Sequence, residues 1–292
     1  MEYFVSFNQK AYYDWQIELL IESFKNHNLQ DKLSVAGANT GENRYKFLSN
    51  IANHENFLNH HSIGLKRGFQ QLDEIYSLAY YQESKKLGTE ICVMQPHVVL
   101  KNPKYLDEIK TNQSSAIVSI DPFFTFEHAE KNAGDFWAKQ AHGREFYKTN
   151  WLPLGSIILF NNLSEQISTR ATIVAEQIIL NQIQQKIPVW NESVKLAWAI
   201  SIADYLGLIK IEASYNLVSN MIDDGSTPFI DYKDGVPPVF NKSMFSFAPP
   251  FEMSFGDPIE VLATCKMSPN ADYMSQISES LLKSRAKLEQ TP

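Results

Sequence analysis

The stretch EICVMQPHVVLKNP, from Glu90 to Pro103, is the most informative segment of this chain about its fold. Glu90–Met94 is expected to be a strand. Its residues after Glu90 are all apolar, which predicts burial on both faces. The polar break Gln95-Pro96-His97 ends that strand, and a second apolar run follows it. A buried strand that stops at polar residues is typical of an α/β protein that binds a ligand at its strand ends.

Apolar runs and helical spacings alternate along the rest of the chain. This alternation predicts an α/β fold with a mainly parallel central sheet flanked by helices. The expected strands are Tyr3–Phe7, Leu33–Ala36, Glu90–Met94, Ala116–Ile120, Ser156–Phe160 and Leu208–Ile211. The expected helices include Leu65–Lys86, Glu192–Leu206 and Ala271–Leu288, and Gly37–Gly64 is expected to be a long loop.

The composition excludes several classes of protein. Apolar residues make up 44% of the 292 residues, enough for a large core, and the net charge of −7 argues against a nucleic-acid-binding surface. The sequence has no run of 18 apolar residues, so we expect no membrane span. The two cysteines, Cys92 and Cys265, form no disulfide framework or zinc motif, and the N-terminus lacks a signal-peptide pattern. We therefore expect a cytoplasmic protein.

Ligands of parallel sheets bind at the carboxyl ends of the strands. Four places follow expected strands in this way: Asn8, Gln95–His97, Asp121 and Asn161–Asn162. The segment Phe7–Lys10 has no glycine-rich phosphate-binding pattern after the first strand. A Rossmann dehydrogenase and a P-loop nucleotidase are therefore disfavoured.

Six short segments, in one order along most of the chain, match a known group of enzymes. They are Tyr12–Gln16, Leu65–Phe69, Ile91–Pro103, Pro153–Ile157, Val189–Glu192 and Ser246–Phe251. Together they resemble the plant and algal peptidyl glycosyltransferases, namely the hydroxyproline arabinosyltransferases and the peptidyl-serine galactosyltransferases. The resemblance implies a single GT-A-like domain, residues 1–256, with a C-terminal helical extension, residues 257–292, packed on it.

The same resemblance implies transfer of a sugar from a nucleotide-sugar donor to an unknown glycan, peptide or small-molecule acceptor. The family holds a divalent cation with two aspartates and a histidine, and these places fall on Gln95, His97 and Ser246. Because all three ligands differ, we expect no Mg²⁺ or Mn²⁺ to be bound in the family manner. Gln95 and His97 are then donor-phosphate contacts, or ordinary polar residues at a strand end; a metal ligand is the third reading.

Further donor contacts are expected near the first strand and the second helix. Lys66 and Arg67 are expected to start a helix, where a positive pair suits a diphosphate, although solvated surface charge is the commoner case. Tyr12 is a candidate for stacking on the nucleobase, although aromatic residues at helical spacing are often core. Ser6 and Asn8 end the first strand, where the nucleotide base and ribose usually sit in the family.

Two carboxylates are candidates for the chemistry. Glu192 follows Trp190 at a helix start, where it would take a proton from the acceptor hydroxyl or shield the positive charge of the sugar. The alternative is a first-turn glutamate favoured by the helix dipole. Asp121 is the second candidate, its alternative being a turn aspartate. Trp190, Gly155 and Ser156 fall on the acceptor side of the family pattern.

Two functions of different classes stay open from the sequence. One is a glycosyltransferase that works without a metal, with His97, Lys66 and Arg67 supplying positive charge. The other is a degenerate GT-A-like protein that binds a nucleotide, glycan or protein partner without catalysis. A thermal-shift screen with uridine and guanosine diphosphates, with and without Mn²⁺, is the simplest experiment that bears on the choice between them.

Overall fold

The computed structural model describes residues 1–8, 11–39, 51, 53–84, 86–110, 115–190, 192–220, 227–231 and 279. These residues belong to two compact units whose segments alternate along the chain. The first unit is Met1–Ser6, His61–Met94 and Asn112–Tyr215, and the second is Phe7–His60, Gln95–Thr111 and Asn216–Pro292. Apart from Glu279, the expected helix at Ala271–Leu288 lies outside the described residues. The expected boundary at residue 256 also lies outside them and stays a prediction.

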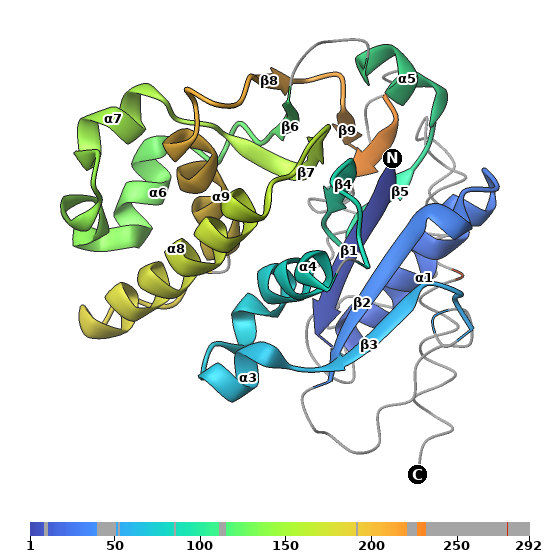
Figure 1. Ribbon diagram of the computed structural model, residues 1–292, viewed down its shortest axis with the longest axis horizontal. Coiled ribbons are helices and arrows are strands. Elements are labelled where there is room, and N and C mark those ends of the chain that lie inside the picture. The colour runs from blue at the N-terminus through green and yellow to red at the C-terminus, as the bar shows by residue number, and fades with distance from the viewer. Residues whose placement is uncertain are drawn as a thin grey trace, which may run out of the picture. The chain divides into compact units, whose positions relative to one another are not determined.

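The first unit is built on a sheet with helices beside it, which confirms the α/β class (Figure 1). Its strands follow the order β1-β4-β7-β6-β8. Every residue of β4 and β7 is buried, as expected for strands covered on both faces. The bounds are Glu2–Asn8 for β1, Ile91–Met94 for β4, Ala116–Ile120 for β6, Leu154–Phe160 for β7 and Ile211–Ser214 for β8.

The direction of β7 differs from the sequence prediction. The pairs β1–β4 and β6–β8 are parallel, but β7 is antiparallel to both β4 and β6. Periodicity missed this because a continuous apolar run marks burial and not direction. The placing of Asn161–Asn162 at the ligand edge was therefore wrong, since β7 ends at the opposite edge. Instead the start of β7 lies beside the carboxyl ends of β4 and β6, through the pairs Met94 with Ile157 and Ile120 with Leu154.

The helices of the first unit form two groups. Helix α8 (Glu165–Gln184) packs against α4 (Asp73–Glu83) and α9 (Ser193–Asp204), and α9 also packs against β7. Thr125 and Ser164 cap α6 and α8 through their side-chain oxygens. The second group, which the sequence analysis did not predict, consists of α6 (Phe126–Ala133), the 3₁₀ helix η3 (Gly134–Lys139) and α7 (Gly143–Thr149).

The expected helix Leu65–Lys86 is broken into three pieces. They are α3 (Ile63–Arg67), the 3₁₀ helix η2 (Gln70–Leu72) and α4. Gly68 ends α3 in the left-handed conformation, with φ 79°, so the helical stripe does not continue through it. Leu65, in the first of these pieces, is 50% exposed.

The second unit joins one long helix to short strands. Helix α1 (Ala11–Lys25) packs on β5 (Val98–Leu100), and the Ser23 hydroxyl accepts a hydrogen bond of 3.1 Å from the Leu100 amide. Strand β10 pairs antiparallel with β5 and parallel with β9. Its other elements among the described residues are η1 (Gln30–Lys32), β2 (Leu33–Asn39), β3 (Phe57–His61), α5 (Lys104–Lys110), β9 (Val218–Asn220) and β10 (Phe229–Asp231). Strand β3 lies within the stretch expected to be a loop.

Candidate active site

Asp121 follows β6 directly and is held by main-chain contacts. A register shift between Val118 and Ile120 marks a β-bulge just before it. The Asp121 amide donates to the Pro153 carbonyl at 2.9 Å. Its carboxylate oxygen Oδ1 accepts a hydrogen bond of 3.0 Å from the Phe123 amide. The aspartate is therefore fixed at the sheet edge where β7 begins.

Glu192 occupies the N-cap position of α9. Its side chain makes no capping hydrogen bond. The turn before the helix is held instead by Ser193, whose amide and hydroxyl both donate to the Trp190 carbonyl, at 3.1 and 2.8 Å. The Glu192 carboxylate is therefore not used to cap the helix.

Lys195, on the first turn of α9, joins the two candidate carboxylates. Its Nζ lies 2.9 Å from Asp121 Oδ2 and 3.3 Å from Glu192 Oε1. The exposed fractions of the three side chains are 8% for Lys195, 17% for Asp121 and 21% for Glu192. A buried ammonium is costly unless it is paired, and two carboxylates offset that cost here. The formal charges of the three groups sum to −1.

An aromatic wall stands beside this cluster. The Phe124 ring lies under Lys195, with Nζ 5.6 Å from its centroid. Trp190 stacks on Phe124, with centroids 5.6 Å apart and planes at 17°, and His128 meets Trp190 edge-on at 5.2 Å. The neighbouring Phe123 is 79% exposed. The wall thus presents aromatic surface next to two carboxylates.

Gly155 has a structural role at the same edge. A Cβ on Gly155 would meet Ser119 Oγ at 2.5 Å and the Ser119 carbonyl oxygen at 3.1 Å. Ser119 Oγ in turn donates to the Ile157 carbonyl and accepts from the Ile157 amide. Gly155 therefore lets β7 approach the bulge that carries Asp121. Ser156 is 4% exposed.

The position of Lys66 and Arg67 in their helix differs from the sequence prediction. Lys66 and Arg67 end α3 and do not start a helix, so the anion-binding end of a helix is not theirs. Arg67 forms an ion pair of 2.8 Å with Glu176, which also accepts a hydrogen bond from Tyr76. The hydrogen bond with Glu176 raises the pKa of Arg67. A donor contact by either residue stays a prediction.

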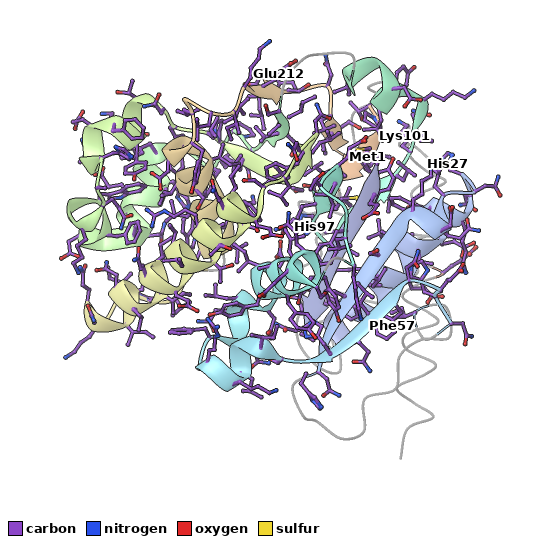
Figure 2. All side chains as sticks on the ribbon, in the orientation of Figure 1. Met1, His27, Phe57, His97, Lys101 and Glu212 are labelled. Carbon is purple, nitrogen blue, oxygen red and sulfur yellow. The ribbon has the colours of Figure 1, made fainter. Side chains whose placement is uncertain are left out.

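The other predicted donor residues are spread over both units. Ser6 is buried in the first unit at 2% exposure. Asn8, Gln95 and His97 belong to the second unit, where His97, labelled in Figure 2, is buried, with its Nε2 3.6 Å from Asp231 Oδ1. For Tyr12 only the main chain, in α1, is described.

The residues at positions 95 and 97 do not fit the metal that the family resemblance implies. The set there is one amide, one imidazole and the carboxylate of Asp231, whereas Mg²⁺ and Mn²⁺ prefer several carboxylate oxygens. Within the described part of the chain, no group of three or more His, Cys, Asp or Glu side chains is arranged to hold a metal ion. The third position, Ser246, lies outside that part.

Sequence reasoning did not predict the contact that joins three of its candidate residues. It selected Asp121, Glu192 and Trp190 separately, and the structure brings them together through Lys195 and Phe124. A signal for Lys195 was present, because positions three apart share one face of a helix and Lys195 follows Glu192 by three. Nothing local indicated that its second partner is Asp121, 74 residues away.

No family model matches the sequence, and neither does any curated protein. Solved glycosyltransferase structures match at low identity. Galactosyltransferase LgtC with donor and acceptor sugar analogues matches with a TM-score of 0.49 and 10% identity over 96% of both chains. Bifunctional glycosyltransferase WbbM matches at 0.45 and 12%, over 94% of this chain and 51% of that one. Mouse xyloside xylosyltransferase 1 matches at 0.43 and 10%, over 79% and 96%. At TM-scores below 0.5, family and activity have to be argued from the residues of this chain.

Proposed function

We propose that this protein is a glycosyltransferase of GT-A type that moves a sugar from a nucleoside-diphosphate donor to a hydroxyl group of an acceptor. One observation carries the proposal: two carboxylates bridged by a buried lysine lie beside an aromatic wall at one sheet edge. Ligands of α/β sheets bind at such edges.

The chemistry of this arrangement suits a sugar. A sugar ring has a face of C–H groups, which packs on aromatic rings, and a rim of hydroxyl groups, which donate to carboxylates. Trp190 is half-buried and Phe123 exposed, so both have surface for such a ring. Glu192 is the nearby carboxylate that can accept from its hydroxyl groups.

In the proposed reaction Glu192 accepts the proton of the acceptor hydroxyl. The hydroxyl oxygen forms a bond to the anomeric carbon of the donor sugar. The bond from that carbon to the phosphate oxygen breaks, and the nucleoside diphosphate leaves with the electron pair. No step uses a metal ion, since the residues at positions 95 and 97 do not suit one.

On the donor side we propose contacts from the residues that the sequence analysis selected. In the first unit these are Ser6, for the nucleoside, and Lys66 and Arg67, for the phosphates. Support for Ser6 comes from its burial near the end of β1, where Val5 pairs with Met94. Asn8, Tyr12, Gln95 and His97, in the second unit, stay predictions of the sequence.

We further propose that the chain is related to the peptidyl arabinosyl- and galactosyltransferases, with their metal motif degenerate. The support is the ordered set of six segments, together with Gln95 and His97 in place of two aspartates. This proposal leaves the donor sugar and the acceptor open.

The test is hydrolysis of UDP-hexoses, UDP-pentoses and GDP-hexoses by the purified chain, in EDTA and then with Mn²⁺. Water takes the place of the acceptor hydroxyl, and the release of UDP or GDP is measured. We expect release from at least one donor in EDTA, and its loss in Glu192→Gln. Thermal shifts with UDP and GDP accompany the assay, because a ligand at 100 times its Kd stabilises by about 2.7 kcal/mol. Stabilisation without release would indicate a non-catalytic nucleotide binder. Absence of both would overturn the proposal.

A further inference from the structure

We propose that Lys195 is a positioning residue, held by Asp121, that orients the carboxylate of Glu192 and offsets the charge beside it. Asp121 is then an anchor and Glu192 the group that meets the acceptor. This role of Lys195 rests on the proposed function. It gives different roles to Asp121 and Glu192, which the sequence offered as alternative catalytic carboxylates.

The contacts of Asp121 suit an anchor. Its Oδ1 accepts from the Phe123 amide at 3.0 Å and its Oδ2 accepts from Lys195 at 2.9 Å, so each oxygen has a partner within the first unit. Its amide is also bonded, to the Pro153 carbonyl. An aspartate whose backbone amide and Oδ1 are both bonded to the main chain can hold a lysine at Oδ2, but it is poorly suited to rotating toward a reacting hydroxyl.

Lys195 is enclosed and its charge is directed at the carboxylates. The side chain is 8% exposed and its Nζ lies 5.6 Å from the Phe124 ring centroid, on which Trp190 stacks. The proposed reaction gives this buried cation no proton to transfer. Two carboxylates within 3.3 Å of one ammonium would repel each other without it. Its remaining use is to hold them together.

Glu192 is the carboxylate that needs orienting. It is more exposed than Asp121, at 21% against 17%, and the helix does not use its side chain as a cap. Its contact with Lys195, at 3.3 Å, is longer than the contact of Asp121. Lys195 therefore sets the direction of the Glu192 carboxylate and offsets the negative charge of Asp121 beside it.

The experiment compares Lys195→Met, Lys195→Arg and a matched control, Lys139→Met. Lys139 has similar partners, an aspartate at 3.3 Å and Asn181 at 2.6 Å, but its side chain is 51% exposed and these partners lie outside the cluster of Asp121, Glu192 and Lys195. For each variant the release of UDP or GDP from the donors above is measured against donor concentration and pH. Circular dichroism and thermal unfolding show that each variant is folded.

We expect Lys195→Met to lower kcat by about 10- to 100-fold and to change the donor KM by less than about twofold. The acid limb of its pH–rate profile should move to higher pH, because a carboxylate that loses a cation and keeps an anionic neighbour retains its proton longer. Lys195→Arg should restore most of the rate and the position of the limb, and Lys139→Met should match the wild type. A residue with a merely structural role would not move the limb.

Two results separate the failures. If Lys195→Met has the same kcat as the wild type and the acid limb of its pH–rate profile does not move, the role of Lys195 is overturned and the proposed function still stands. No turnover by the wild type of any donor would overturn the proposed function and this inference with it.

If Lys195→Met does not fold, Asp121→Asn takes its place, since it removes the anchor. Release of Lys195 should then misplace Glu192 and lower kcat with little change in KM, and an unchanged kcat would count against the proposal.

Discussion

Lys195 Nζ lies 2.9 Å from Asp121 Oδ2, joining the first turn of α9 to the end of β6 across 74 residues of chain. The contact places a helix start and a strand end against each other at one edge of the sheet. Glu192 and Trp190 lie at the start of helix α9, and Phe124 lies in the loop after strand β6. The candidate site of the first unit is organised around this pair.

The bulge that carries Asp121 depends on Gly155. We expect Gly155→Ala to lower the free energy of unfolding by about 1–3 kcal/mol, because the added methyl group would press on Ser119. The measurement is denaturant unfolding of the purified chain. Gly207→Ala is the matched control, since a Cβ there meets nothing within 4 Å. Equal stability of the two variants would show that β7 does not need the close approach.

The junction of α3 and α4 depends on Asp73, which is 1% exposed. Its carboxylate accepts from the Ser62 hydroxyl at 2.6 Å and from the Gly64 amide at 2.8 Å. We expect Asp73→Asn to cost about 1–3 kcal/mol, because the amide puts a donor where an acceptor is needed. The exposed Asp135, which pairs with Lys139, is the control, and Asp135→Asn should cost less than about 1 kcal/mol. If Asp73→Asn lowers the free energy of unfolding no more than Asp135→Asn does, the hydrogen bonds of Asp73 with Ser62 and Gly64 do not stabilise the junction.

His54 predicts a pH dependence of stability in the second unit. Burial lowers the pKa of His54 below its ordinary value, and the ring donates from Nε2 to the Leu33 carbonyl at 2.7 Å. The unfolded chain therefore binds more protons as the pH falls below about 6.5, and stability present above that pH is lost. His54→Gln keeps a donor and removes the titration.

We expect the wild type to lose stability relative to His54→Gln between about pH 7 and 5, by at most about 1.4 kcal/mol per pH unit. Urea unfolding of both proteins across that range measures the difference. A difference that stays constant from pH 8 to 5 would show that the ring is not kept neutral by the fold.

The sequence predicted those parts of the structure that depend on local patterns. Ala116–Ile120 was expected as a strand and forms β6, because its apolar run is bounded by polar residues. The direction of β7 was missed because burial patterns carry no direction, and the break at Gly68 because helical spacing continues through it. For the site, the sequence offered Asp121 and Glu192, but their link depends on long-range packing that no local pattern records.

The most direct test of the proposed function is the donor turnover of Glu192→Gln beside the wild type, at concentrations that occupy the same fraction of sites. Removal of a general base costs about 10²- to 10⁴-fold in rate. We therefore predict that Glu192→Gln binds the donor with an unchanged Kd and releases UDP or GDP at least about 100-fold more slowly. Release at the wild-type rate would contradict the account, because the carboxylate beside Lys195 would then not be the group that performs the chemistry.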